Sequence, residues 1–392
     1  MTRTLHRSGR GAPRAATTFG LALVLLATGV PTRATAQATT SALPKVLVVA
    51  TGGTIAGVQD APGTLGGYRA GTLTAEQVVA SVPELSRFAQ VEAEQFSNVA
   101  STMITPLQWV ALSRRINAVL RDRPEIAGVV VTHGTDRLEE TAFFLYLTIR
   151  SDKPVVVVGA QHPATGISPD GPINLLAAVR TVATADAVGK GVMVVMDDRI
   201  ISAREVRKQY QRVGGFTGGE MGMLGVVSAG GPEFFFAPTR RHGPASEFDL
   251  AGVDSLPRVE LLFSFPGGTG PSLAGPLPGV VVATTGFTRE ESVAYRRLRQ
   301  AGTVVVTAFP SGDNVNTGQR PDVTPPDSAT RAVRSRAAAG AAGADSTARA
   351  EAAAPPTVAV QHLTPQKARI LLMLALTRTH DPREVQRYFD RY

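Results

Sequence analysis

The stretch from residue 45 to residue 57 constrains the fold more than any other. It reads KVLVVATGGTIAG, an apolar and mostly β-branched run that stops at two consecutive glycines. Such a run, bounded by a turn signal, is typical of a strand buried on both faces in a parallel sheet. Open α/β sheets bind ligands at the carboxyl ends of their strands, so the hydroxyl of Thr54 is a candidate functional group. A glycine turn with threonines acting as caps explains this motif equally well on its own.

Apolar runs of strand length alternate with segments of helical periodicity after this stretch. The expected strands cover 90–95, 128–132, 154–160 and 191–196, and the expected helices cover 74–81, a segment starting at Thr105-Pro106, 138–149 and 172–187. This alternation predicts βαβ units and a parallel sheet. We expect the pattern to continue to about residue 240, as part of an α/β domain over residues 43–245.

A shorter set of elements follows and predicts a smaller α/β domain over residues 258–392. Its expected strands cover 258–265, 279–284 and 303–307, and its expected helices cover 288–300, 364–377 and a segment that Asp381 to Glu384 start with a capping box. Residues 321–357 interrupt this set, because Pro, Ala, Ser, Thr and Arg dominate there. Such a composition buries too little apolar surface to offset the entropy of ordering, so we expect a disordered or loosely helical insertion.

The first 36 residues have the pattern of a secretory signal peptide. Arginines precede the apolar run at 19–27, and Ala34-Thr35-Ala36 supplies small residues of the kind that precede a cleavage site. The apolar run is shorter than the roughly 20 residues of a membrane-spanning helix. The pattern predicts a periplasmic or secreted protein that has no membrane contact after cleavage. An uncleaved amino-terminal anchor is the alternative.

The charge balance gives no sign of nucleic-acid binding. The formal net charge is +8, but five of the 40 basic residues and none of the 32 acidic residues fall in 1–36, which leaves 35 against 32, or +3. Nucleic-acid-binding proteins concentrate positive charge on one face, and no basic run with interleaved aromatics occurs here. The chain has no cysteine, so disulfides and thiolate chemistry are excluded.

A second apolar run, like the first, stops at a glycine that is followed by polar side chains. The run at 128–132 stops at His133-Gly134, and a hydroxyl and a carboxylate follow, those of Thr135 and Asp136. Parallel strands deliver their carboxyl ends to one edge, so we expect Thr54, Thr135 and Asp136 to converge. A threonine hydroxyl is a weak nucleophile until a base takes its proton, and a lysine can act as that base when burial lowers its pKa. Lys208, which follows the next suitable strand, is the candidate. By itself Lys208 is equally explained as a surface charge.

At this point the chain resembles a known family. The motifs TGGTIAG at 51–57, THGTDRLEETAFFL at 132–145, VVMDD to REVRK at 194–208 and LTPQKARILLMLALT at 363–377 are similar to those of secreted, type II bacterial L-asparaginases. The similarity covers nearly all of the chain after the leader. It implies a doubly wound, flavodoxin-like amino-terminal domain, a smaller carboxyl-terminal α/β domain, and a homotetramer built as a dimer of dimers.

The resemblance implies catalytic roles for five residues. Thr54 corresponds to the nucleophile that forms an acyl-enzyme ester, and Tyr68 to the tyrosine that activates or positions it. Thr135 and Lys208 correspond to the hydroxyl–amine pair that handles protons. Asp136 corresponds to the carboxylate that binds the substrate's α-ammonium group.

Further residues are expected to bind the substrate. Ser101, followed by Thr102, corresponds to the serine that holds the α-carboxylate. Backbone N–H groups near Gly53 and Ala160 are candidate donors to the oxyanion that develops during amide attack. We expect His133 to be a structural residue with satisfied hydrogen bonds.

Several positions depart from the family pattern. Thr102 stands where type II enzymes usually have Gln, and Arg137 replaces the usual last Thr of HGTDT. Arg137 either lowers the pKa of Asp136, draws in anionic substrates or points to solvent. The family also borrows an Asn and a Glu from a neighbouring subunit. The Asn position falls in Pro266-Gly267-Gly268, which has no amide, and Asp313 is the candidate for the acid.

The sequence therefore predicts hydrolysis of L-asparagine to L-aspartate and ammonia, with no cofactor and no metal. The six histidines are scattered, and neither a G-x-S-x-G elbow nor a Walker A motif occurs. A glutaminase-asparaginase of broader specificity is one alternative. A secreted amino-acid-binding protein that has lost catalysis is another. An ammonia-generating module of a transfer-RNA amidotransferase disagrees with the secretory leader.

Overall fold

A computed structural model describes residues 42–63, 66–272, 275, 277–312 and 354–392. The expected signal peptide, Asp313 and nearly all of the expected insertion lie outside these residues. None of the helices within the described ranges has both the length and the apolar character needed to cross a membrane.

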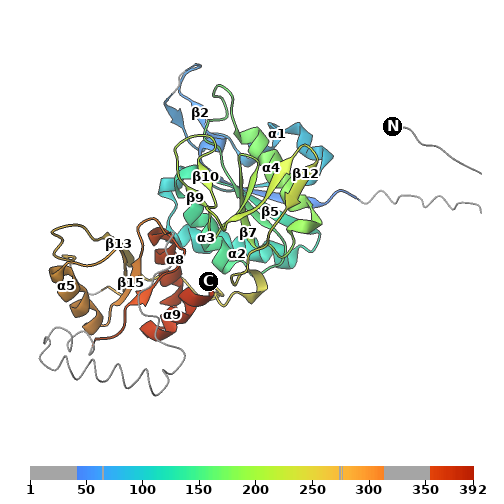
Figure 1. Cartoon of the computed structure of the whole chain (residues 1–392). Helices are drawn as coiled ribbons and strands as arrows, with labels where there is room; N and C mark the ends of the chain where they lie inside the picture. The colour runs from blue at the N-terminus through green and yellow to red at the C-terminus, as the bar shows by residue number, and fades with distance from the viewer. Residues whose placement is uncertain (1–41, 64–65, 273–274, 276, 313–353) are drawn as a thin grey trace, which may run out of the picture. The chain divides into compact units, whose positions relative to one another are not determined.

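The larger sheet, to which the labelled strands β5, β7 and β12 belong (Figure 1), has eight strands. Its strand order is β12-β11-β8-β7-β6-β5-β1-β4. The bounds are β1 Lys45–Gly52, β4 Gln90–Val99, β5 Ile126–Thr132, β6 Val155–Val158, β7 Val192–Met196, β8 Arg199–Ser202, β11 Met223–Ser228 and β12 Gly231–Phe234. The strands β4, β1, β5, β6 and β7 are parallel. Numbered along the chain, these five run 2-1-3-4-5, the flavodoxin-like order, and the order reverses between β1 and β5. The predicted α/β class is thereby confirmed.

The parallel pattern ends earlier than we predicted. Beyond β7 the strands β8, β11 and β12 pair antiparallel, so the expectation of βαβ units to about residue 240 was wrong. Asp197 and Asp198 cause the reversal. Their φ angles are 53° and 60°, as a two-residue hairpin turn requires, and aspartate tolerates this left-handed region better than most residues.

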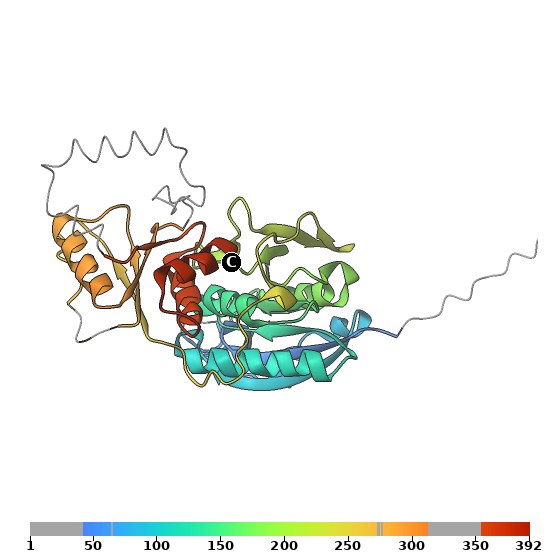
Figure 2. The ribbon, with the colours of Figure 1, turned by 90° about the horizontal axis from the view of Figure 1, so that it is seen from below.

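Four helices connect the parallel strands: α1 Ala75–Ala80, α2 Pro106–Asp122, α3 Leu138–Thr148 and α4 Gly171–Ala183. As predicted, Thr105 caps α2 with Pro106 in the first turn, and its hydroxyl accepts from the backbone of Gln108. Figure 2 shows α2 running alongside the sheet. Successive residues of β5, including Val129 and Val130, are fully buried, so both faces of the sheet are covered.

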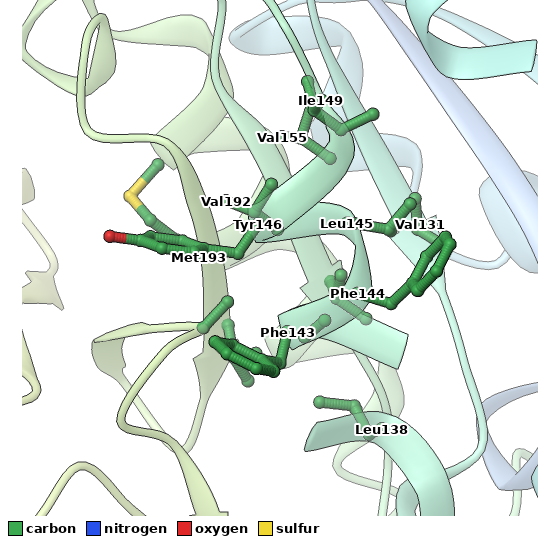
Figure 3. Close-up of a cluster of buried hydrophobic side chains, with 14 of the residues drawn as sticks. Val131, Leu138, Phe143, Phe144, Leu145, Tyr146, Ile149, Val155, Val192 and Met193 are labelled. Atoms are coloured by element: carbon green, nitrogen blue, oxygen red, sulfur yellow. The ribbon is translucent and has the colours of Figure 1, made fainter. Parts of the chain in front are cut away.

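From Ala142 to Leu147, helix α3 is apolar on all sides, as expected of a segment that is buried on all sides. Figure 3 shows Phe143, Phe144 and Tyr146 of this helix among side chains of the sheet such as Val155 and Met193. Away from the sheet, α3 contacts α2 and α8. This helix directly follows Thr135 and Asp136, so its packing fixes the position of the second predicted motif.

The smaller sheet has four parallel strands in the order β13-β14-β15-β16. Its elements are β13 Val259–Phe263, β14 Gly279–Ala283, α5 Arg289–Gln300, β15 Val304–Ala308, β16 Val358–Ala359, α8 Pro365–Ala375 and α9 Pro382–Arg391. The expected capping box of α9 does not form. Asp381 caps the backbone of Arg383, while the Glu384 carboxylate accepts from the hydroxyl of Thr379 instead.

Candidate active site

The predicted strand ends meet where the strand order reverses. The hydroxyl of Thr51 donates to the carbonyl of Thr132 at 2.8 Å, which ties the end of β1 to the end of β5. Two residues further along the chain in each case, just past the two strand ends, the backbones of Gly53 and Gly134 touch, and a Cβ on Gly53 would overlap Gly134. Glycine is required at 53 for this close approach and for a φ of 83°.

Thr54 lies directly after this contact, in the short helix Thr54–Ala56, and is buried. Its hydroxyl shares a 2.7 Å hydrogen bond with the phenol of Tyr68. Tyr68 is 41% exposed and lies on β3 Tyr68–Arg69, which pairs with β2 Val58–Gln59. Neither strand was expected from the sequence, because each has two residues and so carries no periodicity.

The second group is built around Lys208. Its Nζ donates to the hydroxyl of Thr135 at 2.8 Å and to the carboxylate of Asp136 at 2.6 Å. Lys208 lies on β9 Arg207–Lys208, and its backbone N–H donates to the carboxylate of Glu139 at 2.7 Å. The structure thus brings Thr135 and Lys208 together, as the resemblance implied for this pair, and adds Asp136 to them.

The pKa of Asp136 is held below its usual range. The hydrogen bond from Lys208 is the largest cause, and its positive charge adds to it, while burial acts in the opposite direction. Arg137 adds a weaker effect of the same sign as Lys208. The guanidinium of Arg137 is half exposed and pairs with Glu140 at 2.7 Å. Asp136 is therefore an anion at neutral pH, as binding of an ammonium group requires.

Ser101 packs against the second strand end. It is buried in the short helix Ser101–Met103, and its hydroxyl accepts from the backbone N–H of Arg137 at 3.3 Å. A Cβ on Gly134 would lie 2.9 Å from that hydroxyl oxygen, so the glycine makes room for Ser101. Thr102 is exposed on the same turn.

The two predicted backbone donors differ in their surroundings. The N–H of Gly53 donates to the carbonyl of Val99 at 3.0 Å, so its expected role as a donor to an oxyanion conflicts with this bond. Ala160 is fully buried beyond β6. The next N–H groups, of Gln161 and His162, donate to the carboxylate of Asp170. No role was predicted for Asp170 from the sequence.

His133 is fully buried between β5 and Gly134. Its Nδ1 donates to the carbonyl of Gly134 at 2.7 Å, whereas its Nε2 is without a partner among the described residues. The expected hydrogen bond is thus present at one nitrogen, and no group of the described residues meets the other. Burial lowers the pKa of His133 to about 4. The ring is therefore neutral at neutral pH.

Within the described ranges, no cluster of three or more His, Asp or Glu side chains is arranged to hold a metal ion. The arrangement offers hydroxyl, phenol, ammonium and carboxylate groups at the switch point of an α/β sheet. Side chains of these kinds grouped at such a place are typical of the site of an α/β enzyme.

Comparison with known proteins gives the family. Residues 45–240 match the family model described as asparaginase, N-terminal. The chain is 36% identical to L-asparaginase 2 of Bacillus subtilis over 360 residues, covering 89% of this chain and 87% of that protein. It is 36% identical to a glutaminase-asparaginase of Pseudomonas fluorescens over 384 residues, covering 95% of this chain and 97% of that protein.

Among solved structures, a probable cytoplasmic L-asparaginase from Campylobacter jejuni is similar, with a TM-score of 0.75 and 34% identity over 89% of this chain and 100% of that one. The chain belongs to the asparaginase family and is an enzyme of that family. This confirms the family predicted from the motifs.

Proposed function

We propose that the protein hydrolyses the side-chain amide of L-asparagine to L-aspartate and ammonia through an ester on Thr54. One observation carries the proposal. Two groups of side chains lie at the ends of β1 and β5, the strands that flank the switch point. Thr54 after β1 pairs with the phenol of Tyr68, and Thr135 and Asp136 after β5 both bind the ammonium of Lys208. Names of similar proteins support the same substrate class.

The reaction divides into two displacements. The Thr54 oxygen attacks the amide carbon and passes its proton to the phenol oxygen of Tyr68, 2.7 Å away, while the phenol releases its own proton toward the leaving nitrogen. The C–N bond then breaks, and the nitrogen takes up a proton and leaves as ammonia. Water attacks the resulting ester, which releases aspartate and restores the hydroxyl.

Lys208 and Thr135 have a proton-transfer role in this scheme. A lysine that hydrogen-bonds a hydroxyl at 2.8 Å can pass a proton through that hydroxyl to the leaving nitrogen of the amide. In the second displacement it can take a proton by the same route from the attacking water. Asp136, an anion beside this pair, binds the substrate's α-ammonium group, and Ser101 binds the α-carboxylate. A free amino acid held at both charged ends keeps its amide at a fixed distance from Thr54.

The choice between asparagine and glutamine depends on one methylene group. Such a difference is worth about 1–3 kcal/mol in a pocket of fixed size. The compared protein named glutaminase-asparaginase supports broader specificity as the second candidate function. The hairpin that carries Tyr68 is where we expect the two substrates to be distinguished.

We further propose a periplasmic or secreted location, on the pattern of residues 1–36, and a homotetramer that binds no nucleic acid. The domain division at about residues 245–257 belongs to the same proposal. Size-exclusion chromatography with light scattering tests the assembly. Cell fractionation, with mass spectrometry of the mature amino terminus, tests the location.

Ammonia release from L-asparagine and from L-glutamine tests the function itself. We expect release by the purified protein, no release by Thr54→Ala, and partial activity in Thr54→Ser, which keeps a hydroxyl. Calorimetric binding of L-aspartate should survive in Thr54→Ala. Binding of asparagine by the wild-type protein without ammonia release would favour the amino-acid-binding protein instead.

A further inference from the structure

Lys367 is a fully buried lysine that the proposed reaction leaves without a role. It lies on α8 and is 1% exposed. Burying an ammonium group is costly unless its donors are satisfied. Burial lowers the pKa of Lys367 to about 8, although Glu139 and Glu205 raise it, so the group is still charged at neutral pH.

All three hydrogen-bond donors of this ammonium go to one short segment of backbone. Nζ donates to the carbonyls of Ala203, Arg204 and Val206 at 3.2, 2.7 and 2.5 Å. An ammonium group has three N–H donors, so this set of carbonyls uses its full capacity. No aliphatic side chain could satisfy the same carbonyls.

The segment so held leads directly to Lys208. Strand β8 ends at Ser202, residues 203–206 follow, and β9 begins at Arg207. Two residues beyond the last bound carbonyl, Lys208 reaches Thr135 and Asp136. Whether the Lys208 side chain can contact Thr135 and Asp136 therefore depends on the position of the backbone of residues 203–206.

The same lysine also contacts the element that follows Thr135 and Asp136. Its Nζ lies 5.7 Å from the centroid of the Phe143 ring on α3, and α3 packs on α8. Glu139, also on α3, accepts the backbone N–H of Lys208. Lys367 thus contacts both the segment before Lys208 and the helix after Asp136.

We propose that Lys367 is a positioning residue: its three bonds to 203–206 keep the Lys208 ammonium within reach of Thr135 and Asp136. The inference rests on the proposed function of Lys208 in proton transfer. It adds a residue of the smaller α/β region to the control of the site.

Three variants test this role. Lys367→Met keeps the length of the side chain but has no donors. Arg369→Met is the matched control, because Arg369 lies on the same helix and binds one backbone carbonyl, that of Val259, at 2.8 Å. Lys208→Met provides the second background for a double-mutant cycle. Circular dichroism and thermal unfolding establish that each variant is folded, and Lys367→Gln, which keeps two donors, replaces Lys367→Met if that variant does not fold.

We expect Lys367→Met to lower kcat about tenfold or more with little change in KM, because a small displacement of a catalytic group is costly. Arg369→Met should leave kcat unchanged. In the Lys208→Met background, adding Lys367→Met should lower the residual turnover no further. An equal loss in both backgrounds would mean a general structural role and would overturn the proposal.

A second readout does not depend on turnover. The Lys208 side chain is 10% exposed, so reductive methylation followed by peptide mass mapping should modify it slowly in the wild-type protein. Lys367→Met should speed that modification severalfold, and Arg369→Met should not. If the wild-type protein released no ammonia while Lys367→Met still sped the methylation of Lys208, the proposed function would be refuted and the positioning contact supported. Unchanged methylation would refute the positioning contact.

Discussion

Protonation of His133 should make the protein sensitive to acid. The ring is fully buried, its Nδ1 donates to Gly134, and a second N–H on Nε2 would find no acceptor among the described residues. Burial lowers its pKa from the ordinary 6.5 to about 4. Between these values the unfolded chain binds a proton that the folded chain does not, so stability falls as the pH is lowered through this window.

The size of this effect follows from the pKa difference. Each pKa unit corresponds to about 1.4 kcal/mol, so a fall from 6.5 to about 4 corresponds to about 3 kcal/mol of unfolding free energy. The loss begins below pH 6.5 and is complete below about pH 4. The variant His133→Asn keeps an N–H donor for the Gly134 carbonyl but does not titrate, so it should lack this contribution.

Urea unfolding between pH 4 and pH 7 measures the effect. The single tryptophan, Trp109, reports unfolding by fluorescence, since it is buried and stacks on Phe144 with 5.5 Å between ring centroids. Acidic groups contribute equally in wild type and variant, so the difference between their pH profiles isolates the histidine. His380→Asn, at an exposed histidine, should follow the wild type. Parallel profiles for wild type and His133→Asn would refute the reasoning.

Two further perturbations act on the first strand end. Tyr68→Phe removes the phenol oxygen that lies 2.7 Å from the Thr54 hydroxyl, so steady-state assays should show kcat lower by about a hundredfold or more. A fall of less than twofold would show that Tyr68 takes no part in proton transfer. Gly53→Ala places a methyl group inside the backbone of Gly134 at a φ of 83°, and should lower the unfolding free energy by at least about 2 kcal/mol in urea titrations. Wild-type stability in that variant would show that the two strand ends do not need their close contact.

Much of this site could be predicted from the sequence, because strands that are buried on both faces are recognisable as continuous apolar runs. The runs of β1 and β5 are apolar throughout since both faces of the sheet are covered, and their glycines mark the edge where Thr54 and Thr135 lie. Lys208 is different. It lies on a two-residue strand that follows the antiparallel pair β7 and β8, so the residues alone explained it equally well as a surface charge, and the resemblance to a family gave it a specific role.

Other features depend on contacts that a sequence pattern does not encode. The Asp197-Asp198 turn that reverses the chain looks like an ordinary polar loop until its φ angles are known. Asp170 acts by accepting backbone N–H groups eight and nine residues earlier in the chain. Lys367 stands in an apolar helix, where a charged residue would ordinarily be expected to reach solvent, and its acceptors lie more than 160 residues away.

Partitioning with hydroxylamine tests the central claim, an ester on Thr54, most directly. Hydroxylamine competes with water for an acyl-enzyme and yields the hydroxamate of aspartate alongside aspartate. If both substrates form the same ester, L-asparagine and the β-methyl ester of L-aspartate should give one product ratio despite their different leaving groups, and Thr54→Ala should give neither product. A ratio that changes with the leaving group, or turnover that persists in Thr54→Ala, would show that water attacks the substrate directly and would contradict the account.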